Sequence, residues 1–319
     1  MDWVLLGIPL GIVMLYFGSD WLVKGAKNLA LRLGIAPFVV GLTVIAFGSS
    51  APEIITAVVS SDTPDIVLGN ALGSNIANVG IAIGLAALVC PMAAVYKSMK
   101  VEITAMIIAS LVVFAMALTG TIGLVFGIIL LAFLVGFLVL VYMMKKNDTA
   151  GQAAYTDDVE DDGIKGSYPI LLALIAIGLV LLYYGATFFV DGATCLAKMI
   201  GISDLLVGLI IVAIGTSLPE ICICLIAAKK GENELAVANI VGSNIFNATA
   251  VLGTGAVLAN ISVSDTVLMF HLPVMILLSV MLYAMVRFKN NISRVSAVML
   301  MGVYVAYLAF MVAVPSLAM

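Results

Sequence analysis

Long apolar stretches separated by short polar ones make up most of this chain. Stretches of about 18 or more residues in which apolar side chains predominate occur ten times. A helix needs roughly 20 such residues to cross the hydrocarbon core of a bilayer. The pattern therefore predicts an all-α polytopic membrane protein with ten transmembrane helices, over residues 3–23, 35–59, 66–92, 101–118, 122–144, 169–190, 205–228, 235–258, 266–286 and 295–314.

A single long hydrophilic stretch, residues 145–168, separates five predicted spans from the other five. It contains an acidic run from Asp157 to Asp162 that lacks the glycine and the ligand spacing of an EF-hand loop. We interpret the stretch as a solvated linker rather than as a regulatory cation site.

The basic residues indicate how the spans are oriented, because cytoplasmic loops accumulate Lys and Arg. The first apolar stretch lacks a basic start and an Ala-x-Ala cleavage motif, so we expect a retained span and not a signal peptide. With the first terminus outside, Lys198 is the only one of the 14 Lys and Arg residues in an outside loop. We therefore expect a multi-pass protein of the cell membrane, with both termini extracytoplasmic and the linker cytoplasmic.

Two sequence motifs occur twice. The segment GSSAPE at residues 48–53 returns as GTSLPE at 215–220, and GSNIAN at 73–78 returns as GSNIFN at 242–247. Each copy carries five predicted spans, an odd number, so the second copy must enter the membrane from the opposite side. Inverted repeats of this kind are characteristic of secondary transporters, whose substrate sites lie near the bilayer midplane. The predicted division is a first five-helix repeat over 1–144, the linker over 145–168 and an inverted five-helix repeat over 169–319.

The composition excludes other classes of protein. The chain is 64% hydrophobic and 10% charged, whereas soluble domains are about 45–50% apolar and about 25% charged. A soluble globular enzyme is therefore excluded. The chain has no basic block for phosphate contacts, so we expect no nucleic-acid partner.

Glu53 and Glu220 are the two carboxylates that lie deep within predicted spans, at equivalent positions of the two repeats. A charged acid at the bilayer centre costs roughly 2.5–3.5 kcal/mol on insertion scales. No Lys, Arg or His lies at a matching depth to pair with both acids. A bound cation is the natural partner, and the alternative is a pair of structural acids that are protonated or hydrogen-bonded to neighbours.

The spacing around each acid adds oxygen ligands. Hydroxyl residues three and four positions before each acid lie on its face of the helix, and the following span carries a serine and an asparagine four residues apart. The residues of this set are Ser49, Ser50, Ser74 and Asn78 in the first repeat, and Thr216, Ser217, Ser243 and Asn247 in the second.

A proline before each acid interrupts the helix. Pro52 and Pro219 have no backbone N–H, so the carbonyls of Gly48 and Gly215 lose their helical partners. At bilayer depth, unsatisfied carbonyls persist only where they line a cavity or bind something. We therefore expect a kink with freed carbonyls beside each acid.

The resulting set contains carboxylate, hydroxyl, amide and carbonyl oxygens, with no imidazole or thiolate. Such ligands suit hard cations such as Ca²⁺ and Na⁺. Two negative charges are balanced by one Ca²⁺, two Na⁺ or two protons, so these ions compete for the same site. Competition of this kind predicts exchange transport.

The four blocks at residues 48–53, 73–78, 215–220 and 242–247 resemble the alpha-repeats of the sodium/calcium exchanger family, within the calcium/cation antiporter superfamily. The resemblance implies a ten-helix fold in which spans two, three, seven and eight form the ion-binding core. It also implies that spans one and six slide across this core to alternate access.

The resemblance also implies roles for individual residues. Glu53, Glu220, Ser49 and Thr216 resemble the central Ca²⁺ ligands, and Asn78 and Asn247 resemble the ligands of a middle position. The two Na⁺ positions correspond to the Ala46 carbonyl with Ser50 and Ser74, and to the Ala213 carbonyl with Ser217 and Ser243.

Two departures from the family pattern matter. Ser49 stands where threonine is commoner and keeps the hydroxyl, whereas Asn247 replaces an aspartate of some members, including the potassium-dependent branch. We therefore expect K⁺-independent exchange. The family ratio of three Na⁺ to one Ca²⁺ would make transport electrogenic.

A Ca²⁺/H⁺ exchanger that uses the same two glutamates is the alternative, and an intramembrane protease or a passive channel fits the symmetric oxygen set less well. We expect no enzymatic activity, no cofactor and function as a monomer. His271 has no counterpart in the other repeat, so we interpret it as a hydrogen-bonded structural residue. We expect Asp20 and Asp191 to lie near span ends, at the membrane interface.

Overall fold

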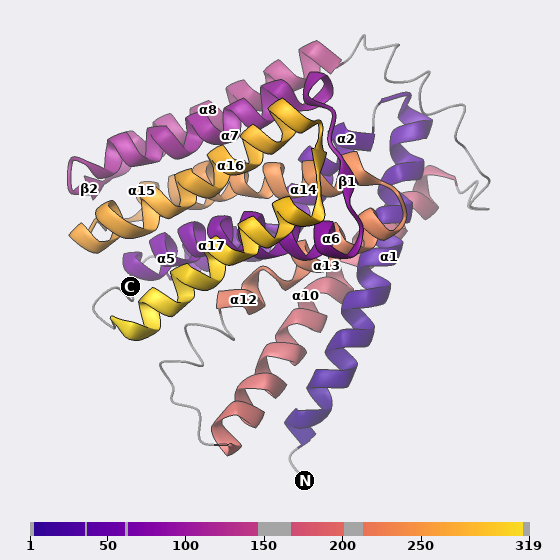
Figure 1. Ribbon diagram of the computed structural model, residues 1–319, viewed down its shortest axis with the longest axis horizontal. Coiled ribbons are helices and arrows are strands. Elements are labelled where there is room, and N and C mark those ends of the chain that lie inside the picture. Colours follow the sequence, from indigo (N-terminus) through magenta and orange to yellow (C-terminus); the bar gives the residue numbers. More distant parts are fainter. Residues whose placement is uncertain (1–2, 36, 61–62, 146–166, 201–212, 315–319) are drawn as a thin grey trace.

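The computed structural model describes residues 3–35, 37–60, 63–145, 167–200 and 213–314. These residues form a bundle of helices with four two-residue strands (Figure 1). Nine of the described helical stretches are long and apolar enough to cross a membrane. They match nine of the ten predicted spans, and the chain is a helical, multi-pass membrane protein. The seventh predicted span, 205–228, lies partly outside the described residues and is helical from Ala213 onward.

The elements of the first half are η1 (Trp3–Leu6), α1 (Gly7–Leu33), α2 (Pro37–Val40), η2 (Gly41–Ile45), α3 (Ala46–Ser49), α4 (Ala51–Val59), α5 (Pro64–Ala77), η3 (Asn78–Ile83), α6 (Gly84–Val89), β1 (Met92–Ala93), α7 (Tyr96–Ala117), β2 (Thr121–Ile122) and α8 (Leu124–Lys145). Those of the second half are α10 (Tyr168–Met199), α12 (Ala213–Thr216), α13 (Leu218–Lys229), α14 (Asn233–Phe246), η5 (Asn247–Val251), α15 (Leu252–Leu258), β3 (Ile261–Ser262), η6 (Val267–His271), α16 (Leu272–Lys289), β4 (Asn291–Ile292) and α17 (Arg294–Ala313).

The long helices α1 and α10 run antiparallel beside each other and project from the rest of the bundle (Figure 1). Both are longer than their predicted spans, which ended just before the charged residues Lys24 and Asp191. Asp20, which was predicted near the end of a span, lies within α1 because the helix continues to Leu33.

A glycine seam, formed by Gly11 and Gly18 of α1 with Gly178 and Gly185 of α10, joins these two helices. A Cβ on Gly11 would lie 2.6 Å from the Gly185 carbonyl oxygen, and one on Gly18 would lie 2.9 Å from the Gly178 carbonyl oxygen. Only glycine permits this closeness of two backbones. The residues of the seam correspond between the two halves at a separation of 167 positions.

Short strands connect the halves at two places. Strand β1 pairs with β4, and β2 pairs with β3, both antiparallel. Strand β1 holds the place in the first half that β3 holds in the second, and β2 corresponds to β4 in the same way. Exchanging the two halves therefore converts one pair into the other, as a twofold axis between the halves requires.

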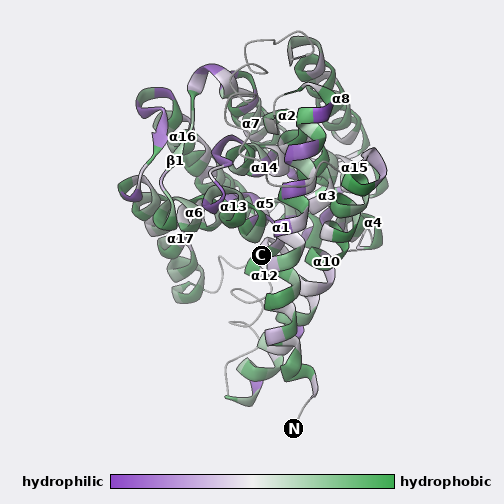
Figure 2. Ribbon diagram, turned by 90° about the vertical axis from the view of Figure 1, so that its right-hand side faces the viewer, coloured by the Kyte–Doolittle hydropathy of each residue, from purple (hydrophilic) through white to green (hydrophobic). Residues whose placement is uncertain are grey.

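The polar residues gather at the centre of the bundle. Every residue of α14 from Leu235 to Phe246 is buried. Figure 2 shows polar segments around α5, α13 and α14, whereas the outer helices α7, α8, α16 and α17 are mostly hydrophobic. The arrangement thus surrounds a polar centre with apolar helices.

Candidate functional site

The two helices that carry the acids are broken, as the prolines predicted. Helix α3 ends at Ser49 and α4 begins at Ala51, while α12 ends at Thr216 and α13 begins at Leu218. The residues at the breaks have nearly the same backbone angles, φ −87° and ψ 2° at Ser50, and φ −91° and ψ 3° at Ser217. Pro52 and Pro219 lie at the starts of the second segments, where a missing N–H removes no helical bond.

The neighbouring spans contain π-helical turns that the sequence did not predict. The turn η3 begins at Asn78, and η5 begins at its counterpart Asn247. A π-helical turn widens the helix locally and is frequent at functional sites. Both asparagines lie at the junction between an α-helical and a π-helical segment.

The two acids lie in the centre of the bundle. Glu53 is 2% exposed and Glu220 is 1% exposed, and the two carboxylates are close enough to repel each other. Among the described residues, no Lys or Arg side chain is buried. The carboxylate oxygens of both acids have no hydrogen-bond partner among the described residues.

Five of the ten other predicted ligands share this condition. Oxygen atoms that are buried and have no hydrogen-bond partner among the described residues belong to Ser50, Ser74, Asn78, Ser217 and Asn247. Buried polar groups are usually hydrogen-bonded, so two acids and five further residues with unpartnered oxygens call for an explanation.

The remaining predicted ligands differ from this group. The Ser49 hydroxyl lies 3.3 Å from the Ser243 hydroxyl and donates to the Ala46 carbonyl at 3.3 Å. That carbonyl also accepts the Ser50 N–H at 3.0 Å. Thr216 is exposed, whereas its counterpart Ser49 is buried. Ala213 begins α12, and its side chain lies outside the described part of the chain.

A reciprocal pair of amides joins the two halves at this centre. Asn75 donates to the Asn244 carbonyl at 3.1 Å, and Asn244 donates to the Asn75 carbonyl at 3.2 Å. Asn78 donates to the Asn244 side-chain oxygen at 3.1 Å. Asn75 and Asn244 were not among the predicted site residues, although both stand in the duplicated GSN motif. These bonds fix α5 against α14.

One buried acid was also missed. Glu102 of α7 is 1% exposed and is a third buried carboxylate among the described residues. Glu102 is the second residue of the predicted span 101–118, and its position in the sequence gives no sign of burial. Packing of α7 against α14 and α16 covers it.

His271 hydrogen-bonds the Tyr307 hydroxyl through Nδ1 at 2.9 Å, so it is hydrogen-bonded, as predicted.

A cavity of about 240 Å³ reaches Glu53 from one end of the bundle. Asn70, Asp191 and Thr216 also line it. The α10 residues that line this cavity lie in the half of α10 that packs against the beginning of α1. We call this end of the bundle the open face.

Ion pairs lie towards the opposite end, which we call the closed face. Lys27 of α1 pairs with Glu232 at 2.7 Å, and Asp20 pairs with Lys230 at 2.6 Å and with Lys24 at 3.0 Å. Residues 230–232 join α13 to α14, so these pairs attach the far half of α1 to the helices that carry Glu220 and Asn247.

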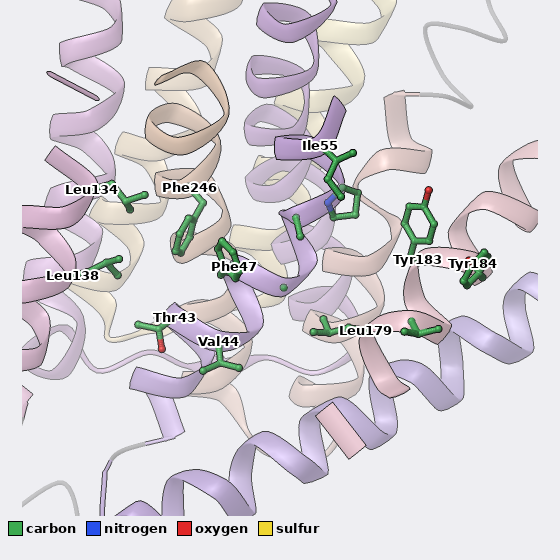
Figure 3. Close-up of a pocket in the computed structure, with 14 residues that line it drawn as sticks. Thr43, Val44, Phe47, Ile55, Leu134, Leu138, Leu179, Tyr183, Tyr184 and Phe246 are labelled. Atoms are coloured by element: carbon green, nitrogen blue, oxygen red, sulfur yellow. The ribbon is translucent and has the colours of Figure 1, made fainter. Parts of the chain in front are cut away.

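A second cavity of about 980 Å³ lies beside the break between α3 and α4. Figure 3 shows Phe47, Leu134, Leu138, Leu179 and Phe246 among the side chains that line it. This lining is almost wholly apolar, so the cavity suits hydrocarbon and offers no path for an ion.

Paired broken helices, reciprocal contacts between two halves and a buried oxygen cluster define a membrane transport protein. Residues 3–143 and 170–313 match the family described as sodium/calcium exchanger protein. The chain belongs to this family, and it is a cation antiporter rather than an enzyme.

The alignments with similar proteins cover nearly the whole chain. It is 32% identical over 334 aligned positions to the sodium/calcium exchanger MaX1 of Methanosarcina acetivorans, which covers 94% of this chain and 95% of MaX1. It is 33% identical over 306 residues to the membrane protein MJ0091 of Methanocaldococcus jannaschii, with coverage of 94% and 95%. Its fold is similar to that of the sodium-calcium exchanger NCX_Mj soaked with zero Na⁺ and Ca²⁺, with a TM-score of 0.84, 29% identity and coverage of 97% of this chain and 99% of that one.

Proposed function

We propose that this protein exchanges Na⁺ for Ca²⁺ across the cell membrane by alternating access. The observation that carries the proposal is the cluster of buried oxygens without hydrogen-bond partners around Glu53 and Glu220. Two carboxylates without a basic partner require cations, and neutral oxygens around them complete a shell for Ca²⁺ or Na⁺. The name of the similar exchanger MaX1 supports the same pair of ions.

The proposed ligands are those predicted from the sequence. Glu53, Glu220, Ser49 and Thr216 hold Ca²⁺, and Asn78 and Asn247 hold the middle position. The two Na⁺ positions use the Ala46 carbonyl with Ser50 and Ser74, and the Ala213 carbonyl with Ser217 and Ser243. Competition for the same negative charge couples the two fluxes.

The proposed architecture is an inverted repeat of ten spans, with five-helix repeats over 1–144 and 169–319 and a linker over 145–168. The exchanged strand pairs, the glycine seam and the reciprocal amides support it. Helices α1 and α10 move together across the core as a monomer alternates between its two faces. The closed face is cytoplasmic, and both termini are extracytoplasmic.

The test is Ca²⁺ uptake into proteoliposomes that are loaded with Na⁺. We expect uptake that requires an outward Na⁺ gradient and proceeds without K⁺. Uptake driven equally well by a pH gradient in sodium-free medium would identify a Ca²⁺/H⁺ exchanger instead.

The exchange should also respond to voltage. Three Na⁺ for one Ca²⁺ moves one net charge, worth about 2.3 kcal/mol per 100 mV. One net positive charge leaves the vesicle as Ca²⁺ enters, so we expect an interior-positive potential, imposed with valinomycin, to accelerate Ca²⁺ uptake and an interior-negative potential to slow it. A rate that is independent of the imposed potential would contradict electrogenic exchange.

A further inference from the structure

Asn239 of α14 carries a buried amide and is not among the predicted ligands. Its side chain is 0% exposed, and neither its Oδ1 nor its Nδ2 has a hydrogen-bond partner among the described residues. Leaving both atoms of an amide unpartnered inside a protein is costly, so this position needs an explanation.

The internal repeat gives Asn239 a counterpart. Asn70 precedes the first GSN motif as Asn239 precedes the second, 169 positions later. Asn70 lines the cavity of the open face together with Glu53. The repeat therefore leads us to expect Asn239 beside Glu220, on the side of the closed face, and α14 does pack against α13, which carries Glu220.

Asn239 also continues the row of proposed ligands along α14. Asn239 and Ser243 are four residues apart, and Asn247 follows four residues later, so all three lie on one side of the helix. Asn70, Ser74 and Asn78 repeat this spacing in the first half. Each row leads from the centre towards one face.

The two faces differ in a way that explains the burial. The Lys27–Glu232 and Asp20–Lys230 ion pairs hold α1 against the start of α14. The counterparts of Lys27, Glu232 and Asp20 are Thr194, Thr63 and Thr187, which carry no charge. Ion pairs therefore lie on the side of the bundle where we expect the Asn239 path, while Asn70 lines a cavity.

We propose that Asn239 is a transit ligand for the transported cation on the closed face. When that face opens, its amide oxygen coordinates Na⁺ or Ca²⁺ between Glu220 and the solvent, and Asn70 does the same on the open face. This inference rests on the proposed exchange function.

The test measures Ca²⁺ affinity separately at the two faces, in inside-out and right-side-out membrane vesicles. Asn239→Leu removes the oxygen ligand at similar volume, and Asn70→Leu is the matched variant. We expect Asn239→Leu to raise the half-saturating Ca²⁺ concentration at the closed face about fivefold, on the order of 1 kcal/mol, and to leave the open face unchanged. Asn70→Leu should show the reverse selectivity.

Asn239→Asp keeps the oxygen ligand and adds a negative charge. It tests the proposal independently if Asn239→Leu fails to insert into the membrane. We expect Asn239→Asp to lower the half-saturating Ca²⁺ concentration at the closed face alone. Equal changes at both faces, or none at either, would show that Asn239 is structural. A wild-type protein without exchange would instead overturn the proposed function.

Discussion

Individual side chains determine the chemistry of this exchanger. Glu53 and Glu220 are buried without basic partners among the described residues, and neutral oxygens of the same repeated motifs are also buried without hydrogen-bond partners. The duplicated motifs allowed most of these residues to be predicted, because helical spacing alone places a hydroxyl near an acid three or four residues away. Whether acids on two different helices meet depends on packing.

Replacement of either acid should abolish exchange. Glu53→Gln and Glu220→Gln each remove half of the negative charge that balances the cations, so we expect Ca²⁺ uptake in Na⁺-loaded proteoliposomes to fall to the level of protein-free vesicles. Glu102→Gln is the matched control, since it alters a carboxylate that is equally buried but lies on α7, outside the proposed ligand set. It should retain uptake.

Robust transport by Glu53→Gln or Glu220→Gln would remove that residue from the coordination shell. Loss of transport in Glu102→Gln, with normal insertion, would instead extend the site to α7.

At the scale of secondary-structure elements, small backbone departures shape the site. The breaks at Ser50 and Ser217 were predictable from proline, whereas the π-helical turns at Asn78 and Asn247 were not. Proline acts through a local steric and hydrogen-bonding rule. A π-helical turn has no comparable residue signature, and packing of the neighbouring helices stabilises it.

The glycine seam is also an element-scale feature. Its heptad spacing is visible in the sequence, at Gly11 and Gly18 and at Gly178 and Gly185, but which helix it faces is not. Close backbone packing couples α1 and α10, so the two helices are suited to moving as one unit.

An alanine in the seam should destabilise the protein. The new Cβ of Gly11→Ala would lie 2.6 Å from the Gly185 carbonyl oxygen, and backbone must shift to relieve the contact. We expect a loss of about 1–3 kcal/mol in the free energy of unfolding, measured as a lower midpoint of thermal unfolding in detergent. In the control Gly136→Ala, the Cβ would meet nothing within 4 Å, and stability should be unchanged. Equal unfolding midpoints for Gly11→Ala and Gly136→Ala would contradict the close packing of α1 against α10 at the glycine seam.

At the scale of the whole molecule, the two faces are unequal although the halves are related. The ion pairs of Lys27 with Glu232 and of Asp20 with Lys230 occur at the closed face. The cavity beside Glu53 lies at the open face. Because these charges have no charged counterparts in the other half, the sequence itself biases the molecule towards one state.

Breaking an ion pair should therefore make the closed face more accessible. Partly exposed ion pairs contribute about 0.5–1 kcal/mol, so Lys27→Ala should increase the population that is open at this face roughly twofold to fivefold. The measurement is the rate at which an impermeant maleimide, added from the closed face, labels Ser19→Cys in a background without the native cysteines. Ser19 is 0% exposed, and its counterpart Ala186 lines the cavity of the open face.

The charge-swapped variant with Lys27→Glu and Glu232→Lys is the control for this experiment. It restores an ion pair with the opposite polarity, so the labelling rate should return to that of the protein with Lys27 and Glu232. An unchanged rate in Lys27→Ala would show that the pair does not hold this face closed.

The sequence by itself determined the membrane class, nine of the spans that the structure describes, the helix breaks and the candidate ligands. These follow from hydrophobic length, proline geometry and helical spacing, which act over a few residues or a single helix. Only the tertiary structure decided that Glu53 and Glu220 are both buried, that Asn75 and Asn244 join the halves, that Glu102 is buried, and that ion pairs form at one face. Each of these depends on contacts between helices far apart in the chain, and the apolar pattern of a membrane helix does not specify which neighbour its polar residues face.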